Sequence, residues 1–350
     1  MSETIHFLYP GDIDTPTGGY AYDRRLISAM REEGVLVQAA SLGEGYPAPS
    51  NAALERAAAA FAKMADGSTV IVDGLAFGVL DEIAHAHRNR LRLIALVHHP
   101  LALETGLDAR RSEVLRRSET RALSLAHAVI ATSRATADML VAEFGVQKEK
   151  ITVAEPGFDR AEPSRGRNDG KVGLIAVGSV VPRKDYATLV AALARLTDLP
   201  WHLDIAGDDT RDTEYAASIR QMVEANGLPS RITLHGALSA EALDELYASA
   251  DIFALTTRYE GYGMAFAEAM MRGLPVVATG EGAVRDTVPE SVGFVLAGGD
   301  AEGVSRALSK LIADAGLRAT LRMAAMKHAK SLPAWRDTAQ SVITGIKETQ

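Results

Sequence analysis

Short apolar runs alternate with longer stretches of helical periodicity along almost the whole chain. This alternation predicts βα units, in which parallel strands form a sheet and helices cover both of its faces. The runs in the first half that we interpret as strands are Ile5–Tyr9, Val35–Ala40, Thr69–Val72, Leu91–His98, Ala128–Thr132 and Ile151–Ala154. The helical patterns between them are Tyr20–Glu32, Ala52–Met64, Glu113–Ser124 and Arg134–Phe144.

A polar segment, residues 159–171, interrupts the alternation and is typical of an interdomain linker because it contains Gly and Pro without apolar periodicity. The alternation then resumes with predicted strands at Gly173–Val177, His202–Ala206, Ile232–His235, Ile252–Leu255, Pro275–Ala278 and Gly293–Leu296. The intervening helical patterns include Tyr186–Leu196, Thr213–Asn226, Ala240–Ala248 and Ala301–Ala315. We therefore expect an α/β protein with two Rossmann-like, doubly wound parallel-sheet domains, residues 1–160 and residues 171–334, which face a cleft.

Composition narrows the classes of function. The net charge of −8 argues against a nucleic-acid-binding protein. The absence of cysteine excludes disulfides, zinc–thiolate sites and cysteine nucleophiles. The N-terminus lacks the basic and apolar regions of a signal peptide, and no apolar run approaches the roughly 20 residues that span a bilayer. We expect a cytoplasmic protein.

Ligands of open α/β sheets bind beyond the carboxyl ends of the strands, so the residues that follow each predicted strand are the candidates. Arg183 and Lys184 follow the strand Gly173–Val177, at the predicted start of the next helix. Cations are unfavourable at a helix N-terminus, and a bound diphosphate would explain both of them. The alternative is a solvated basic loop in which Asp185 caps the helix.

Two carboxylates, Glu260 and Glu268, follow the strand Ile252–Leu255. Gly261 and Gly263 stand between them, just before a predicted helix, where glycine lets a backbone approach phosphate closely. Glutamates beside such a site would accept hydrogen bonds from ligand hydroxyls, and one Glu can accept both hydroxyls of a ribose. The alternatives are an i,i+4 pair of Glu268 with Arg272 and a solvated loop position for Glu260.

The first half offers a smaller set of candidates. Gly18 and Gly19 precede a predicted helix and form a natural anion site, although a simple turn explains them as well. His98 ends the predicted strand Leu91–His98 and His99 follows it, at a position where a histidine could hold a substrate hydroxyl or act as acid or base. A structural role is the alternative for either histidine.

Two further patterns have simpler explanations. The acidic pairs Asp12 with Asp14 and Asp208 with Asp209 resemble metal ligands, but aspartate is common in turns after strands, and we expect no metal. Residues 85–121 carry eight arginines against four acids. This Arg-rich region could contact an anionic membrane surface, or it is a solvated helix face with a Glu113–Arg117 pair.

Several motifs together resemble the retaining glycosyltransferases of family 4, which have the GT-B fold. The strongest is E-x7-E, formed by Glu260 and Glu268 within Y-E-G-Y-G-M-A-F-A-E-A-M-M-R-G-L-P-V-V-A-T. The segment G-S-V-V-P-R-K-D resembles that family's donor-phosphate segment, and L-D-I-A-G-D, H-G-A-L-S and Y-A-S-A-D-I-F occupy their usual places. Two departures are E-P-G-F-D at residues 155–159, where the family often has P-N-G-V-D, and T-G-E-G in place of a G-G-x-x-E.

The resemblance implies roles for individual residues. Arg183 and Lys184 would hold the diphosphate of a nucleotide-sugar, Glu268 the ribose, and Glu260 the donor sugar. His98, or else His99, would match the family's histidine near that sugar, and residues 335–350 would cross back onto the first domain. The implied catalytic residues are His98, Arg183, Lys184 and Glu260. The implied donor-binding residues are Gly18, Gly19, Arg183, Lys184, Glu260, Gly261, Tyr262, Gly263, Met264, Ala265 and Glu268.

The implied activity is transfer of a sugar, with retention, from a UDP- or GDP-sugar to a hydroxyl of a glycan, lipid or small molecule. No metal and no cofactor other than the donor substrate are implied. A peripheral contact of the Arg-rich region with the inner face of the membrane is compatible with this activity. The alternatives are a sugar phosphorylase or nucleotide-sugar epimerase on the same fold, and a nucleotide-sugar-binding protein without catalysis.

Overall fold

The computed structural model describes residues 4–104 and 106–348. The chain divides into two compact units. Unit 1 comprises Met1–Gly157 with Pro333–Gln350, and unit 2 comprises Phe158–Leu332.

The sheet of unit 1 has six parallel strands in the order β2-β1-β3-β4-β5-β6. The strands are β1 (Thr4–Tyr9), β2 (Leu36–Ser41), β3 (Thr69–Asp73), β4 (Arg92–Val97), β5 (Ala128–Ala131) and β6 (Ile151–Val153). The central strands β3 and β4 are buried along nearly their whole length, which agrees with their unbroken Val, Ile and Leu content. The predicted parallel sheet is confirmed.

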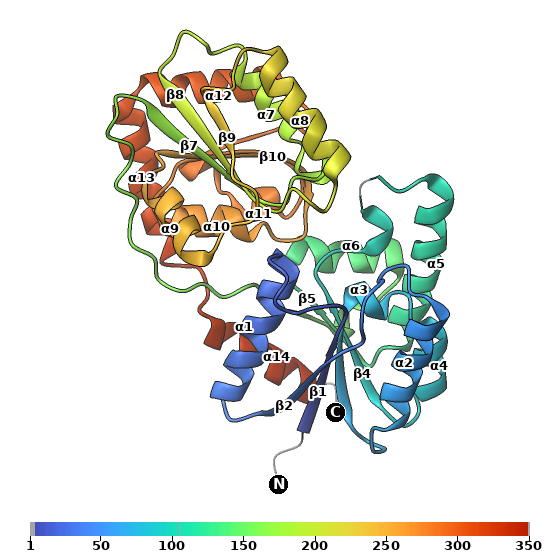
Figure 1. The fold of residues 1–350 in the computed structure, drawn as a ribbon. Coiled ribbons are helices and arrows are strands. Elements are labelled where there is room, and N and C mark those ends of the chain that lie inside the picture. Colours follow the sequence, from blue (N-terminus) through green and yellow to red (C-terminus); the bar gives the residue numbers. More distant parts are fainter. Residues whose placement is uncertain (1–3, 105, 349–350) are drawn as a thin grey trace. The chain divides into compact units, whose positions relative to one another are not determined.

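Helices lie on both faces of this sheet, with α1 and α14 together on one face and α2, α4 and α5 on the other (Figure 1). Most of them begin after a capping side chain that accepts a backbone N–H group, such as Asp108 before α5 and Ser133 before α6. The helices of unit 1 are α1 (Gly18–Glu32), α2 (Asn51–Ala62), α3 (Gly74–Phe77), α4 (Asp81–His87), α5 (Ala109–Leu125), α6 (Arg134–Phe144) and α14 (Trp335–Glu348), with 3-10 turns η1 (Leu101–Leu103) and η2 (Lys148–Lys150).

Helix α14 is part of the core of unit 1. The Trp335 ring packs edge-on against Tyr22 of α1 with ring centroids 5.6 Å apart, and the Thr338 hydroxyl donates to the carbonyl of Glu155 at 2.8 Å. A Cβ atom on Gly157 would lie 2.2 Å from the backbone nitrogen of Trp335, so only glycine fits at this approach. The segment that begins at Trp335 therefore completes unit 1.

Unit 2 repeats the architecture with six parallel strands in the order β12-β11-β10-β7-β8-β9. The strands are β7 (Val172–Val177), β8 (Trp201–Ala206), β9 (Ile232–Leu234), β10 (Ile252–Glu260), β11 (Val276–Gly282) and β12 (Gly293–Leu296). Helices α7, α8 and α12 lie on one face, and α9, α10 and α13 on the other (Figure 1). The helices of unit 2 are α7 (Tyr186–Leu193), α8 (Thr213–Ala225), α9 (Ala240–Ala248), α10 (Met264–Met271), α11 (Val284–Thr287), α12 (Ala301–Ala313) and α13 (Ala315–Ala329), with 3-10 turns η3 (Pro182–Lys184) and η4 (Glu290–Val292).

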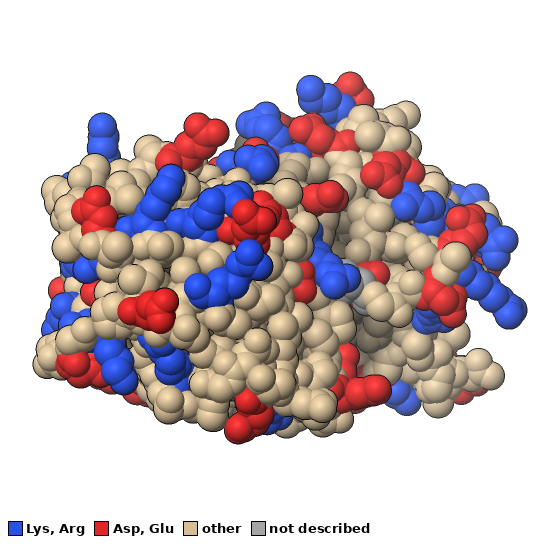
Figure 2. Space-filling model, turned by 90° about the horizontal axis from the view of Figure 1, so that it is seen from above, with Lys and Arg blue, Asp and Glu red and all other residues tan. Residues whose placement is uncertain are grey.

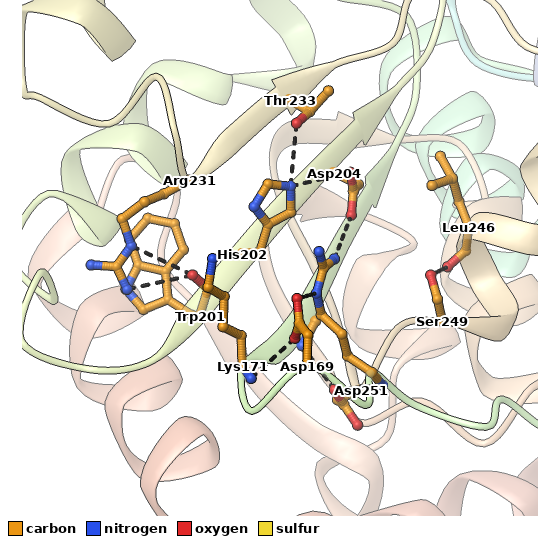
Figure 3. A network of polar contacts seen from close by, with 12 residues as sticks. Asp169, Lys171, Trp201, His202, Asp204, Arg231, Thr233, Leu246, Ser249 and Asp251 are labelled. Atoms are coloured by element: carbon orange, nitrogen blue, oxygen red, sulfur yellow. Dashed lines mark hydrogen bonds and ion pairs between the residues drawn. The ribbon is translucent and has the colours of Figure 1, made fainter.

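Residues 159–171 differ from the expected linker because much of the segment is fastened to unit 2. Ser164 is buried, and its hydroxyl donates to the carbonyls of Ala248 and Ala250. The Arg167 guanidinium lies 3.5 Å from Asp204 of β8. Asp204, Asp169 and Asp251 belong to the polar network shown in Figure 3. Asp251 accepts hydrogen bonds from the backbone N–H groups of Arg167 and Gly173. The segment is irregular in backbone but belongs to unit 2.

We expect Trp335→Ala to destabilise unit 1 selectively, because truncating a buried aromatic side chain costs about 3–5 kcal/mol. Amide hydrogen exchange followed by mass spectrometry should show faster exchange in the peptides of α1 and α14. Arg336→Ala is the matched control, since the neighbouring Arg336 is exposed and makes a surface pair with Glu33. Equal acceleration in the sheet of unit 2, or none in either unit, would contradict the assignment.

Candidate functional site

The candidate residues of unit 2 gather at the carboxyl ends of two neighbouring strands, β7 and β10. Strand β10 is longer than predicted and extends from Ile252 to Glu260, with an irregularity in its pairing to β11 between Thr256 and Tyr259. Glu260 is the last residue of this strand and is buried, 6% exposed. The alternative of a solvated loop acid at Glu260 is therefore wrong.

The sequence predicts Arg183 and Lys184 at the start of the helix that follows β7. In the structure they lie instead in the 3-10 turn η3, just before α7. Asp185 separates the two elements with a left-handed backbone (φ 44°), an unfavourable conformation for a residue with a side chain. Its carboxylate accepts from the Thr188 hydroxyl and does not cap α7 through a backbone N–H. Both cations therefore lie before α7, in the turn η3.

Both cations contact Glu260. Lys184 Nζ lies 2.6 Å from Glu260 Oε1, and Arg183 Nη1 lies 3.4 Å from Oε2. Arg183 also donates to the carbonyl of Tyr259 at 2.9 Å. Residues 76 positions apart in sequence thus form one charged cluster at the end of the sheet.

Burial alone would raise the pKa of Glu260, but the charges of Lys184 and Arg183 outweigh it and hold the pKa below its usual range. Glu260 is therefore an ionised carboxylate in a buried position. Such a group would cost several kcal/mol without its cationic partners. The cluster of Arg183, Lys184 and Glu260 carries two positive charges and one negative charge, so its net charge is positive.

The two glycines after Glu260 form a tight turn into α10. Gly263 has φ 88° at the position before the helix, and a Cβ atom there would lie 2.6 Å from Phe266. Tyr262 is buried, and its backbone carbonyl accepts from the Thr287 hydroxyl. The backbone from Gly261 through Met264 and Ala265 therefore leads directly from the charged cluster into the first turn of α10.

Glu268 lies in the second half of α10 and is half-buried. Its Oε2 accepts a hydrogen bond from the Tyr247 hydroxyl at 3.3 Å, and burial raises its pKa despite the nearby Arg272. Arg272 donates to the backbone carbonyl of Glu268 and pairs with Asp244. The expected i,i+4 ion pair between Glu268 and Arg272 is therefore replaced by other contacts. The Glu268 carboxylate accepts from the Tyr247 hydroxyl, and the Arg272 guanidinium contacts the helix backbone and Asp244.

The structure brings the candidates of unit 1 together as well. Thr17 caps α1, which begins at Gly18, and a Cβ atom on Gly19 would lie 3.4 Å from the His98 ring. His98 Nε2 lies 3.1 Å from Asp23 Oδ1 and 3.4 Å from Asp73 Oδ2. His99 Nε2 instead lies 3.0 Å from Glu104. Of the two histidines, His98 is the one beside the glycines.

Sequence reasoning missed Asp23 and Asp73. Asp73 directly follows the predicted strand Thr69–Val72, so the rule that ligands bind beyond strand ends would have found it. Asp23 occupies the apolar stripe of α1 that includes Leu26, Ile27 and Met30. A carboxylate in such a stripe is the same signal that marks Glu268.

The acidic pairs serve local turns. Asp12 accepts from the backbone N–H of Asp14, and Asp208 accepts from Thr210. Asp209 pairs with Arg220.

The Arg-rich region is largely paired with acids and carbonyls. Arg116 pairs with Glu143, and Arg121 pairs with Asp81 and Glu82. On the face seen in Figure 2, basic and acidic side chains are interspersed. Within residues 4–104 and 106–348, no helix is long and apolar enough to cross a membrane.

Family models match most of the chain in two parts. Residues 158–328 match "Glycosyl transferases group 1", and residues 35–162 match "Glycosyltransferase Family 4". Mannosylfructose-phosphate synthase of Agrobacterium fabrum is 27% identical over 238 residues, which is 63% of this chain and 52% of that protein. An MMP alpha-(1->4)-mannosyltransferase of Mycolicibacterium hassiacum is 28% identical over 261 residues, or 70% of this chain and 61% of that protein. The aligned region thus spans little more than half of these curated relatives.

Solved structures share the fold over the full length. Sucrose-phosphate synthase from Thermosynechococcus elongatus superposes with a TM-score of 0.84 at 20% identity, covering 99% of this chain and 98% of that one. Anabaena HepE in complex with UDP-glucose gives a TM-score of 0.77 at 19% identity, covering 98% and 99%. The chain has two all-parallel six-stranded sheets, matches both family models and shares its fold with these solved structures. It therefore belongs to the family 4, group 1 glycosyltransferases of the GT-B fold.

Proposed function

We propose that the protein is a retaining glycosyltransferase that transfers a sugar from a nucleoside-diphosphate sugar to a hydroxyl acceptor. The observation that carries this proposal is the convergence of Arg183 and Lys184 on Glu260 at the end of β10. Guanidinium and ammonium groups both suit phosphate, and their net positive charge is not cancelled by the single carboxylate. Family membership and the solved complexes of HepE with UDP and UDP-glucose support a nucleotide-sugar donor.

The chemistry that these residues would perform is mainly electrostatic. When the sugar–phosphate bond breaks, negative charge grows on the departing diphosphate while the sugar becomes oxocarbenium-like. Lys184 and Arg183 would stabilise that charge from fixed positions without a metal ion. For retention, the acceptor hydroxyl would attack from the side of the departing phosphate, which takes the hydroxyl proton. Glu268 would accept hydrogen bonds from the ribose hydroxyls, since a carboxylate that accepts from one phenol keeps further acceptor capacity.

Glu260 has a second part in this scheme. Its carboxylate pairs with both cations, and Lys184 Nζ is only 2.6 Å away. A diphosphate that binds these cations must share them with Glu260. We infer that Glu260 then turns its hydrogen-bonding capacity toward the hydroxyls of the donor sugar.

The first prediction concerns the donor. UDP-, GDP- and ADP-sugars should be screened for thermal stabilisation of the full chain, because a ligand that binds only the folded state raises its melting temperature. Stabilising donors are then offered to hydroxyl acceptors, including phosphorylated sugars and inositol phosphates in view of the relatives' names. We expect sugar transfer with retained anomeric configuration, measured by NMR. Stabilisation without turnover would instead favour a non-catalytic binder, phosphate-dependent cleavage a sugar phosphorylase, and inversion at the sugar C2 an epimerase.

The second prediction concerns phosphate binding. Lys184→Ala should weaken binding of the nucleoside diphosphate by about 10- to 100-fold, the usual effect of losing a hydrogen bond to a charged group. Isothermal titration calorimetry measures this, with the exposed Lys171→Ala as the matched control in the same unit. Because removing Lys184 leaves Glu260 short of a partner, the double variant Lys184→Ala/Glu260→Gln separates lost binding from lost stability. Unchanged affinity in both Lys184→Ala and Glu268→Ala would refute the assigned site.

The third prediction separates Glu260 from the phosphate-binding residues. Glu260→Gln keeps the side-chain shape but removes the anion that competes with phosphate for Lys184 and Arg183. Affinity for the nucleoside diphosphate should therefore equal or exceed that of the unaltered protein, whereas kcat for transfer should fall. A parallel loss of diphosphate affinity and kcat would show that Glu260 does not act on the sugar.

A further inference from the structure

A buried charged cluster in unit 1 surrounds the ring of His98. Three elements contribute to it: His98 follows β4, Asp73 ends the neighbouring strand β3, and Asp23 lies in the second turn of α1. Both carboxylates approach the same ring nitrogen, Nε2, at 3.1 Å for Asp23 and 3.4 Å for Asp73. Two carboxylates thus contact the imidazole through the single nitrogen Nε2.

The burial of the two carboxylates sets the charge of the ring. Asp23 is 0% and Asp73 is 2% exposed, so neither is stabilised by water. Asp73 Oδ1 accepts from the backbone N–H of Leu75 at 2.7 Å, but Asp23 Oδ2 has no hydrogen-bond partner among the described residues. Two adjacent buried carboxylates cannot both stay ionised without a cation. A protonated His98 is the cation that the geometry supplies.

The expected ionisation agrees with this geometry. Burial lowers the pKa of His98, but the charges and hydrogen bonds of Asp23 and Asp73 outweigh it and raise the pKa to about 10. Burial and the charge of Asp73 raise the pKa of Asp23 to about 7, against the opposing effect of His98. The third titratable group against the ring is Tyr22, whose phenol donates to the carbonyl of Ala154 and whose pKa burial raises further. Tyr22 therefore stays neutral.

The surroundings also fix the orientation of the ring. Tyr22 meets it edge-on with ring centroids 5.2 Å apart, and Gly19 approaches its Cδ2 edge. The Thr132 hydroxyl donates to the backbone carbonyl of His98 at 3.2 Å. About a fifth of the side chain, 21%, stays exposed. Since Nε2 is engaged by the carboxylates, a ligand at this exposed part would be met by the other nitrogen, Nδ1.

We propose that Asp23 is a positioning residue that locks His98 as an imidazolium, with Nε2 turned into the core and the Nδ1–H offered to a ligand oxygen. His98 then acts as a charged hydrogen-bond donor and not as a general base. The part of this proposal that concerns a ligand rests on the proposed function, whereas the charge and orientation of the ring do not.

The first test measures the ring directly. In the full chain labelled with ¹⁵N-histidine, long-range ¹H–¹⁵N spectra distinguish an imidazolium from either neutral tautomer, and His98→Gln identifies the resonance. We expect both nitrogens of His98 to be protonated at about pH 7.5, and Asp23→Asn to lower the pKa of His98 by more than about one unit. Asp138→Asn, at an exposed position of α6, is the control that should leave it unchanged. A neutral His98 at this pH overturns the proposal, whether or not any transferase activity is found.

A metal ion is the competing occupant, because the ligand atoms of Asp23, Asp73 and His98 all lie within 4.8 Å of one another. A metal would replace the proton on Nε2. Addition of Zn²⁺ or Mn²⁺ should therefore leave the imidazolium signal unchanged. Loss of that signal at stoichiometric metal, reversed by a chelator, overturns the proposal.

The second test uses turnover with whichever donor the screen identifies. Asp23→Asn should lower kcat by about 10- to 100-fold with little change in the KM for the donor, as expected when a group is misplaced. Its activity should also fall as pH rises through the lowered pKa of His98, whereas the unaltered protein keeps its activity there because its imidazolium persists. The proposal is overturned if the activity of Asp23→Asn does not depend on pH and its kcat falls only in proportion to the fraction of folded protein. That result indicates a merely structural role for Asp23.

Discussion

In a parallel sheet every strand ends at the same edge, and nearly every other feature of this protein depends on that constraint. Both faces of such a sheet are buried under helices, so the strands themselves offer polar side chains to a ligand mainly where they end. Strands β7 and β10 are neighbours in the sheet although a long stretch of chain separates them. Their adjacency is what allows Lys184, which follows β7, to meet Glu260 at the end of β10.

The two units use one electrostatic arrangement with different residues. In unit 2 the charges of Lys184 and Arg183 hold the pKa of the buried Glu260 carboxylate below its usual range. In unit 1 the buried carboxylates of Asp23 and Asp73 are matched by a histidine, whose charge depends on them. Under the proposals made above, the first arrangement would offer a positive excess to a phosphate, and the second would offer a single polarised N–H. The two clusters would then suit ligand groups of different chemistry.

Much of the fold could be predicted from the sequence because short, largely apolar runs alternate regularly with longer helical patterns, and that alternation indicates parallel βα units. What could not be predicted depends on tertiary packing. Strand β10 continues to Glu260 because its pairing with β11 resumes after an irregularity between Thr256 and Tyr259. The residue types in this stretch do not predict that continuation. The short helices α3 and α4 lie in a stretch where the sequence predicts no element, because a few helical residues show no clear period.

The site residues were predictable to a similar degree. Arg183, Lys184, Glu260 and Glu268 are visible in the sequence because a charge beside glycines or inside an apolar helix is unusual. Asp23 carries the weaker form of the same signal: it lies in the apolar stripe of α1, but its partner His98 is distant in sequence and only the fold brings the two together. Residues 159–171 resemble a linker in the sequence because the contacts that hold them are invisible there. Those contacts are made with the distant residues Ala248, Ala250 and Asp204.

The place of α14 in unit 1 has a consequence for biosynthesis. Unit 2 is one continuous stretch, Phe158–Leu332, whereas unit 1 needs Pro333–Gln350 in addition to Met1–Gly157. A ribosome therefore finishes all of unit 2 before it makes the helix that covers Tyr22 and Gly157. Domains generally fold as their chains emerge, the first-made domain first. Here the order of completion is the opposite: unit 2 can be complete while unit 1 still lacks α14 and leaves the surface around Tyr22 and Gly157 uncovered.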